Sequence, residues 1–129
     1  LTIIETGGMK GRRKEITREE LHYKLQKGFN SKNIRSEYGM TELLSQAYSK
    51  RNGVFRTPSW LKVFVRDTNN PFSVKSKGRG ALNFIDLANI NSCSFIASDD
   101  LGEIYQDSSF KVLGRLSDSE IRGCNLMFN

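Results

Sequence analysis

One segment decides the expected fold: residues 33–42, with the sequence NIRSEYGMTE. Its first half, Asn33 to Glu37, has the composition of a short strand and runs directly into Tyr38-Gly39-Met40-Thr41-Glu42. The residues that follow predict a second, shorter helix, with apolar positions at Leu43, Leu44, Ala47 and Tyr48. The pentapeptide from Tyr38 to Glu42 is therefore expected to join the end of a strand to the start of a helix.

The upstream residues predict the same alternation of strand and helix. Leu1 to Thr6 is a β-branched run stopped by Gly7-Gly8, which is typical of a buried strand entering a tight loop. Thr17-Arg18-Glu19-Glu20 has the spacing of a capping box, so that the Thr17 hydroxyl and the Glu20 carboxylate bind the first free amides. The expected helix has apolar residues at every fourth position and Gly28 near its end; these positions are Leu21, Leu25 and Phe29.

The pattern changes after Gly53. Residues 61–66 alternate between apolar and other side chains with a period of two, which indicates a strand. Three further short strands are expected at 78–87, 93–97 and 110–113, separated by turn-forming residues. We therefore expect an α/β (α+β) fold with two parts and a boundary near residues 50–58. Residues 1–54 are the carboxy-terminal piece of a mainly parallel α/β layer, and residues 55–129 form a small antiparallel sheet or distorted β-barrel.

Composition narrows the function classes. The 129 residues carry a net charge of +6 and include two cysteines and one histidine, His22. Cys93 and Cys124 lack a CxxC spacing, which argues against a zinc site, and the absence of a secretion signal predicts free thiols in the cytoplasm. No apolar run approaches the ~20 residues of a membrane-spanning helix. The chain starts with Leu1-Thr2-Ile3-Ile4, which reads as the middle of a strand, so we expect further sequence upstream.

The basic residues have two interpretations. One cluster stands at positions 10–14, formed by Lys10, Arg12, Arg13 and Lys14. Nucleic-acid-binding proteins usually interleave such clusters with aromatic residues or show a known module, and neither is present. We therefore expect no nucleic-acid partner. A solvated loop is favoured over a surface that contacts phosphates or an acidic partner.

Three segments carry candidate chemistry. In the first, residues 38–42, a strand end meets a helix start, where free amides and the helix dipole favour phosphate. The Thr41 hydroxyl and the Glu42 carboxylate there would suit a phosphate oxygen and its magnesium ion, which prefers oxygen ligands. The alternative interpretation makes Thr41 an N-cap and Glu42 an ordinary acid of the first turn.

The second segment is Ser98-Asp99-Asp100-Leu101-Gly102, which follows the apolar strand 93–97. A carboxylate at a strand end can accept hydrogen bonds from both hydroxyls of a ribose. The alternative is a β-turn, in which Asp and Gly are common. The third segment, GRLSDSEIRGC at 114–124, combines a glycine turn, the guanidinium of Arg115 and the thiol of Cys124 beside Arg122. Alone, Cys124 is more typical of a small buried apolar residue than of a reactive thiol.

The order of these segments resembles that of the adenylate-forming (acyl-activating) ligases: a glycine pair after a strand, then YGMTE, SDDLG and GRLSDSEIRG. The ending GRLSDSEIRGCNL is most similar to LuxE-type acyl-protein synthetases, which activate a fatty acid with ATP as acyl-AMP and move the acyl group to their own cysteine. The resemblance implies ATP and Mg²⁺ as cofactors, a fatty acid or another carboxylic acid as substrate, and an acyl-reductase or acyl-transfer protein as partner.

The resemblance also implies a role for individual residues. Tyr38 would lie against the adenine, with backbone contacts from Gly7 and Gly8 near it, and Arg115 would reach ribose or phosphate. Gly39 would be a further cofactor-binding position. The catalytic positions would be Thr41 at the α-phosphate, Glu42, which would also hold magnesium, and Cys124 as acyl acceptor. Asp100 would bind the cofactor at its ribose hydroxyls. Cys93, inside the predicted strand, is expected to be buried and inert.

Two departures from the family pattern leave alternatives open. Ser98-Asp99 stands where the superfamily prefers Thr-Gly, and no Ser/Thr/Gly-rich phosphate loop is present. We expect an acid–thiol ligase fragment that is inactive alone. The alternatives are a coenzyme A ligase similar to phenylacetate ligases, in which coenzyme A takes the acyl group, and a non-catalytic nucleotide-binding or interaction module.

Overall fold

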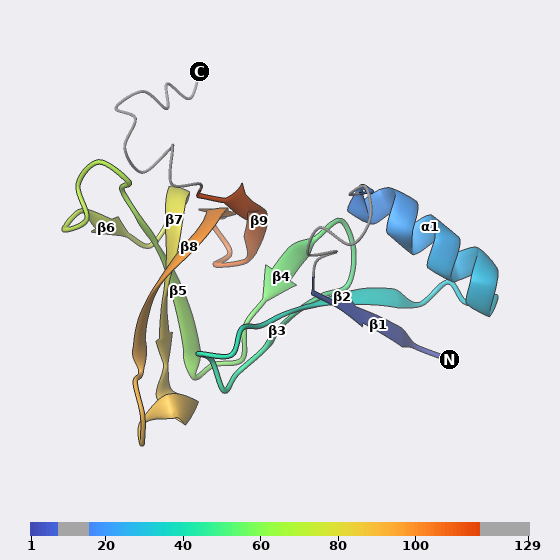
Figure 1. Cartoon of the computed structure of the whole chain (residues 1–129), viewed down its shortest axis with the longest axis horizontal. Helices are drawn as coiled ribbons and strands as arrows, with labels where there is room; N and C mark the ends of the chain where they lie inside the picture. The colour runs from blue at the N-terminus through green and yellow to red at the C-terminus, as the bar shows by residue number, and fades with distance from the viewer. Residues whose placement is uncertain (8–15, 117–129) are drawn as a thin grey trace.

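The computed structural model describes residues 1–7 and 16–116 (Figure 1). Its strands form one nine-stranded sheet in the order β1-β2-β3-β4-β9-β8-β7-β5-β6. The elements are β1 (Ile3–Thr6), α1 (Arg18–Phe29), β2 (Ile34–Tyr38), β3 (Ala47–Ser49), β4 (Val54–Arg56), β5 (Leu61–Arg66), β6 (Val74–Lys75), β7 (Gly78–Asp86), the 3₁₀ turn η1 (Leu87–Asn89), β8 (Phe95–Ile104) and β9 (Phe110–Arg115).

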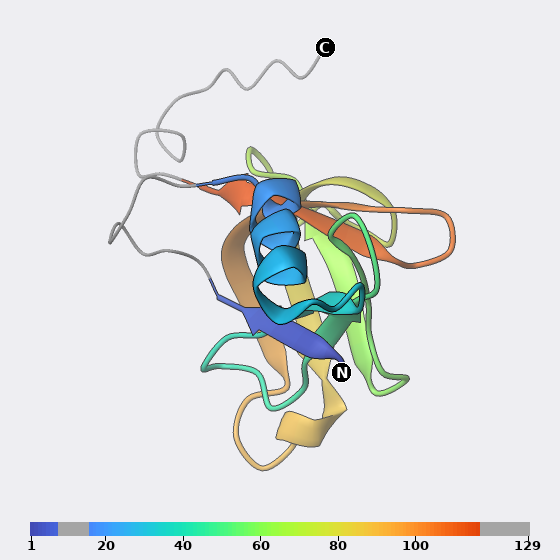
Figure 2. The same ribbon diagram turned by 90° about the vertical axis from the view of Figure 1, so that its right-hand side faces the viewer.

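The sheet is mixed. β1 and β2 pair in parallel, with Ile3 opposite Ile34 and Thr6 opposite Glu37, and α1 is the crossover between them. The other neighbouring strands pair antiparallel. The expected α+β class is therefore confirmed: an open mixed sheet with one α-helix in the described residues. Figure 2 shows α1 in front of the strands, at the end of the sheet that β1 and β2 form.

The predicted cap of α1 is half present. Thr17 Oγ1 accepts a hydrogen bond from the Glu20 amide at 3.2 Å, but the Glu20 carboxylate lies 2.7 Å from Lys24 Nζ. The helix also continues past Gly28 and is capped by Asn30, which adopts a left-handed conformation (φ 47°) and donates its N–H to the Gln26 carbonyl. Asparagine tolerates this conformation because its short polar side chain is accommodated there.

No helix in the described residues is long and apolar enough to span a bilayer.

The predicted helix after Glu42 is wrong. Residues 39–46 are turns and irregular backbone, and β3 begins at Ala47. Burial here follows a period of two, because Leu43, Ser45, Ala47 and Ser49 are buried. Leu44 and Tyr48, which a helix would have placed on its apolar face, are 62% and 43% exposed. A pair of buried serines gave the segment a strand pattern that the apolar residues alone did not reveal.

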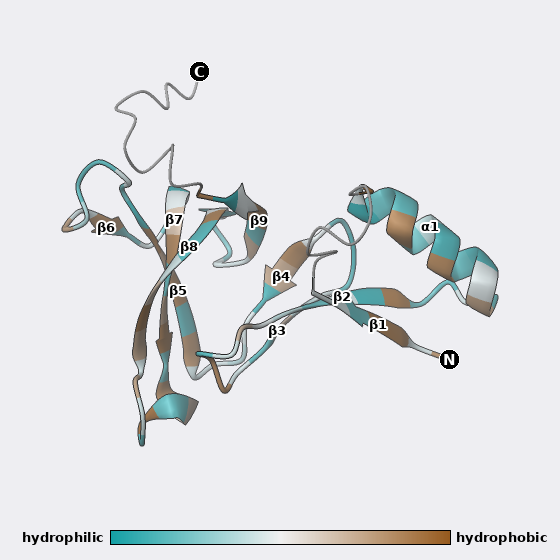
Figure 3. Cartoon of the chain, viewed as in Figure 1, coloured by the Kyte–Doolittle hydropathy of each residue, from teal (hydrophilic) through white to brown (hydrophobic). Residues whose placement is uncertain are grey.

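The core lies where β4, β9, β8, β7 and β5 adjoin. Three phenylalanine rings, Phe55, Phe84 and Phe110, are at most 1% exposed and pack with aliphatic side chains such as Leu61 and Leu82. Figure 3 shows hydrophobic and hydrophilic residues alternating along the strands, as expected for a sheet with one face in a core. Each such ring contributes about 1.5–3 kcal/mol by leaving water.

The strand expected at 93–97 also differs from the observed strand, because β8 does not end at Ala97. It runs from Phe95 to Ile104, so residues 98–102 lie within a strand and not at a strand end or in a turn. Gly114 is likewise inside β9. Pairing on both sides, with β7 and β9, overrides the turn-forming composition of this segment. Cys93 precedes β8, in the connection after η1, and its side chain is exposed, so the expectation that it is buried is wrong.

Candidate active site

Strands β2, β8 and β9 bring together one residue from each of the three sequence segments that carry candidate chemistry. The Tyr38 hydroxyl donates a hydrogen bond of 2.6 Å to Asp100 Oδ2, although the two residues are 62 positions apart. Arg115 Nε lies 3.9 Å from the other carboxylate oxygen, Asp100 Oδ1. Asp100 therefore faces a phenol on one side and a guanidinium on the other. We call Tyr38, Asp100 and Arg115 the carboxylate cluster.

The sheet register produces this cluster. Asp100 and Arg115 are directly opposite partners in the β8–β9 ladder, so their side chains emerge together. Tyr38 is the last residue of β2 and approaches the same place from the other side of β3 and β4. The Leu116 amide donates to the Asp99 carbonyl at 2.7 Å, which extends the pairing of the two strands beyond Arg115.

The Tyr38 ring is anchored in the core. Its centroid lies 5.8, 5.7 and 5.5 Å from those of Phe55, Phe84 and Phe110, respectively. Burial raises the pKa of Tyr38, and the hydrogen bond to the negatively charged Asp100 raises it further. The phenol therefore stays protonated and acts as a donor to the carboxylate. Part of the residue remains accessible.

Ser98 holds the backbone beside Asp100. Its hydroxyl donates to the Leu82 carbonyl at 2.8 Å and accepts from the Asp100 amide at 3.2 Å. Leu82 lies at the bulge between Ala81 and Asn83 in β7, where the regular ladder is interrupted. Arg66 adds a bond of 2.9 Å from Nη2 to the Ser98 carbonyl and one of 3.1 Å from Nε to Asn83 Oδ1. Arg66 and Asn83 were missed by sequence reasoning, because nothing local marks a partner strand.

A second polar network fastens the loop that carries Thr41 and Glu42. Asp86, at the end of β7, accepts from the Leu44 and Ser45 amides at 3.0 and 2.9 Å with Oδ2. Its Oδ1 accepts from Ser45 Oγ at 2.7 Å and from the Ala88 amide at 3.1 Å. Burial of the carboxylate opposes ionisation, but these hydrogen bonds outweigh it, and the pKa of Asp86 is lowered.

Two further side chains complete this network. Asn89 Nδ2 donates to the Glu42 carbonyl at 2.8 Å and to the Cys93 carbonyl at 2.9 Å. Trp60 Nε1 donates to Ser45 Oγ at 3.0 Å. We call Asp86, Asn89, Trp60 and Ser45 the loop anchor. The signal that could have identified it is a pair of polar residues, Asp86 at the end of β7 and Asn89 in the turn η1 that follows.

Thr41 and Glu42 themselves point their side chains to solvent. Both are exposed and lie in a turn. Among the described residues, no hydrogen bond or ion pair links either side chain to the carboxylate cluster, and no group of three or more His, Cys, Asp or Glu residues could hold a metal. Mg²⁺ commonly uses one or two carboxylates, waters and the phosphates of its substrate. The single free carboxylate of Glu42 fits that use and would not suffice for a metal bound by protein alone.

The remaining expected site residues divide into two groups. Gly7 is described and has φ +82°, a conformation that favours glycine, and Gly39 has the Gln46 side chain 3.3 Å from where a Cβ would stand. Gly8, Arg122 and Cys124 lie outside the described residues. The structure thus brings Tyr38, Asp100 and Arg115 together and anchors the Thr41–Glu42 loop by its backbone.

Several solved structures share this fold. Apo MatB from Rhodopseudomonas palustris matches with a TM-score of 0.63 and 16% identity over 91% of this chain and 26% of its own. The luciferase-like enzyme of the Zophobas morio mealworm matches at 0.60 and 15% over 88% and 31%. A Mycobacterium tuberculosis fatty acyl CoA synthetase matches at 0.56 and 17% over 88% and 24%. The chain spans about a quarter to a third of these proteins, and the likeness shows that it shares their fold over that part.

The family of the chain is shown by a match between its sequence and a family model. The model of the family described as "Acyl-protein synthetase, LuxE" matches residues 1–129. The chain belongs to this family. No curated protein matches it.

Proposed function

We propose that this chain is part of an ATP-dependent acyl-protein synthetase, which activates a fatty acid as acyl-AMP and transfers the acyl group to its own Cys124. The observation that carries the proposal is the carboxylate cluster. Tyr38, Asp100 and Arg115 come from three separate motifs and share one carboxylate. The family match over the whole chain supports the same activity.

The cluster suits the sugar of a nucleotide. Asp100 has acceptor lone pairs for two ribose hydroxyls, and Tyr38 and Arg115 orient its two oxygens. Arg115 is 77% exposed in its side chain and its contact with Asp100 is long, so it is free to turn toward a phosphate or a ribose. The accessible part of the Tyr38 ring would contact the base. Gly7 and Gly39 would let the backbone approach it.

The Thr41–Glu42 loop would hold the reacting phosphate. The loop anchor fixes its backbone while both side chains remain exposed, which leaves the Thr41 hydroxyl available to a phosphate oxygen. Glu42 would bind the magnesium ion, whose charge offsets that of the phosphates. The fatty-acid carboxylate oxygen then attacks the α-phosphorus of ATP, and pyrophosphate leaves.

The second step is transfer. The Cys124 sulfur, as thiolate, attacks the acyl carbonyl carbon, and AMP leaves with the electron pair of the broken C–O bond. Arg122 is close in sequence and would favour the thiolate. The resulting thioester would serve an acyl-reductase or acyl-transfer partner. Coenzyme A as the acceptor is the competing function, since one of the solved structures with this fold is a fatty acyl CoA synthetase.

The proposal is tested by ATP–pyrophosphate exchange in the full-length protein with fatty acids of graded length. We expect exchange that requires both Mg²⁺ and a fatty acid. Asp100→Ala removes the ribose acceptors and should lower exchange ten- to a hundredfold, since each hydrogen bond to a charged group contributes about 1.5–3 kcal/mol. The matched control is Asp99→Ala, which removes the neighbouring exposed carboxylate and should leave exchange unchanged. Equal activity of the two variants would exclude the cluster as a nucleotide site.

A further inference from the structure

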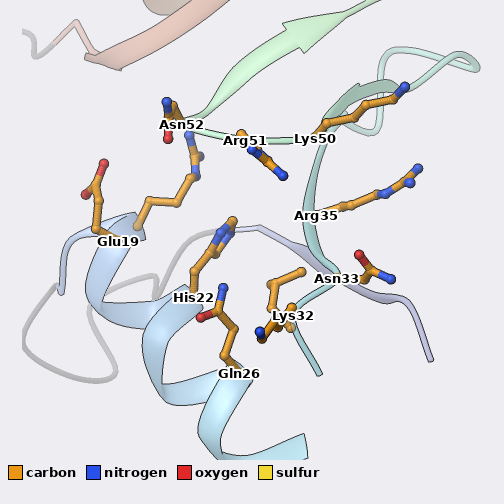
Figure 4. A pocket seen from close by; sticks show the side chains of 11 residues that line it. Glu19, His22, Gln26, Lys32, Asn33, Arg35, Lys50, Arg51 and Asn52 are labelled. Carbon is orange, nitrogen blue, oxygen red and sulfur yellow. The ribbon is translucent and has the colours of Figure 1, made fainter. Parts of the chain in front are cut away.

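A hollow lies at the opposite end of β2 from Tyr38. It has a volume of about 350 Å³ and is walled by α1, by the start of β2 and by the turn between β3 and β4. None of Tyr38, Asp100 and Arg115 lines it. Its size falls at the lower end of the range for small-molecule pockets. We call it the α1 pocket (Figure 4).

The α1 pocket is strongly basic. Five cations line it against one carboxylate, Glu19; they are Arg18, Lys32, Arg35, Lys50 and Arg51. Arg18 pairs with Glu5 at 3.5 Å. For the other four, no carboxylate of the described residues lies within 4.0 Å. Figure 4 shows His22 and Gln26 projecting from α1 and Arg51 projecting toward them from the opposite wall, with Lys32 below.

The wall formed by α1 is held in place before any ligand binds. The Arg18 guanidinium lies 5.2 Å from the centroid of the Phe55 ring. Gly53 makes room for it, because a Cβ there would overlap Arg18 Nη1. His22 Nε2 lies 3.3 Å from Glu5 Oε1 and 3.1 Å from Ser36 Oγ. A wall fixed in this way loses little conformational entropy when a ligand binds.

We infer that the α1 pocket binds a phosphate-bearing small molecule. Phosphate carries up to two charges on three oxygens, which matches guanidinium and ammonium groups that arrive from separate elements. The amides of Gln26 and Asn52 add neutral donors for its remaining oxygens. A hollow of this volume has the size of a small-molecule site, whereas specific protein–protein interfaces bury about 800 Å² on each partner. The inference is independent of the proposed function, because no residue of the carboxylate cluster takes part.

The test is calorimetric titration of inorganic pyrophosphate into the full-length protein without Mg²⁺, at about 0.1 M salt, where charges ~10 Å apart are largely screened. The double variant Lys32→Ala/Arg51→Ala should bind pyrophosphate at least tenfold more weakly. The matched control, Lys62→Ala/Lys75→Ala, removes two exposed cations that do not line the pocket. It should bind as the unchanged protein does. Circular dichroism confirms that each variant is folded.

Four results would overturn the inference. The first is undetectable binding, and the second is an equal loss in the two double variants, which would reflect net charge alone. The third is a loss caused by Arg115→Ala and not by the pocket variant, which would place pyrophosphate in the nucleotide site. The fourth is tighter binding of octaglutamate than of pyrophosphate, which would make the pocket a contact for an acidic protein. The exchange activity of the pocket variant reports on the proposed function separately.

Discussion

Ser45 binds both oxygens of the buried Asp86 carboxylate, with its amide 2.9 Å from Oδ2 and its hydroxyl 2.7 Å from Oδ1. Asp86 is fully buried at the end of β7, and Ser45 closes the loop that carries Thr41 and Glu42. The two residues are 41 positions apart, so their contact joins the loop to the core sheet. Within the described residues, every buried side-chain polar atom has a hydrogen-bond partner. The loop anchor is therefore a complete network, and damage to it should be costly.

Asp86→Asn tests the anchor at nearly constant volume. The amide group can replace only one acceptor oxygen, so its NH₂ must face donors that the carboxylate accepted. We expect a loss of about 1–3 kcal/mol in the free energy of unfolding, measured by urea denaturation. Asp99→Asn is the control, because that exposed side chain makes no hydrogen bond to another described residue and should change stability by less than about 0.5 kcal/mol. A similar stability for both variants would show that the anchor is not needed.

The Asp86 carboxylate should also make the free energy of unfolding depend on pH. The pKa of Asp86 is lowered from 3.8, so the unfolded chain binds this proton at higher pH than the folded protein does. Its stabilising contribution is therefore fully present above pH 3.8 and is lost as the pH falls below that value. Urea denaturation at a series of pH values should show this loss in the unchanged protein. In Asp86→Asn the loss should be smaller, and identical pH profiles would contradict the lowered pKa.

Gly102 tests the packing beneath the carboxylate cluster. A Cβ at this position in β8 would lie 2.6 Å from Leu82 Cδ2 and 2.8 Å from the Lys111 carbonyl oxygen. The clash involves backbone, so Gly102→Ala should cost about 1–3 kcal/mol in thermal or urea unfolding. Gly114→Ala, in the paired strand β9, would place its Cβ more than 4 Å from the atoms of the residues that the structure describes, and it should be close to neutral. A neutral Gly102→Ala would mean that β8 and β9 are further apart than described.

The hydroxyl of Tyr38 can be tested separately from its ring. Tyr38→Phe keeps the packing against the three phenylalanines but removes the donor to Asp100. We expect a modest loss of stability, about 0.5–1.5 kcal/mol, and a raised Michaelis constant for ATP in the exchange assay, because Asp100 loses one of its two orienting partners. Tyr48→Phe, at a hydroxyl outside the cluster, is the control for that assay. An unchanged Michaelis constant in Tyr38→Phe would remove the phenol from the nucleotide site.

Periodicity and capping in the sequence correctly predicted the elements that depend only on neighbouring residues. The strand at 3–6, the helix after Thr17, the strand at 34–38 and the alternating strand at 61–66 all follow from periodicity and capping within a few residues. The helix after Glu42 failed for a non-local reason. Asp86, about forty positions away, takes the Leu44 and Ser45 amides. A single-sequence pattern does not contain that contact.

The candidate site also contains both residues that the sequence identified and residues that it did not. Tyr38, Asp100 and Arg115 were identified from motif order, and the structure brings them together. The side chains that support Ser98 beside this cluster, Arg66 and Asn83, belong to β5 and β7. The loop anchor also includes residues distant in the sequence from the Thr41–Glu42 loop, namely Trp60, Asp86 and Asn89. Cys93 was misjudged because the strand was expected to begin two residues too early. Its exposed thiol means that an acylation experiment needs Cys93→Ser as a control.

The most direct test of the account is covalent labelling of the full-length protein with ATP, Mg²⁺ and a labelled fatty acid. We predict a thioester on Cys124 that hydroxylamine releases, present in Cys93→Ser and absent in Cys124→Ser. Acyl-AMP formation should persist in Cys124→Ser, since the nucleotide site is intact. Label that survives in Cys124→Ser, or full-rate transfer to coenzyme A by that variant, would contradict the acyl-protein synthetase mechanism and favour a coenzyme A ligase.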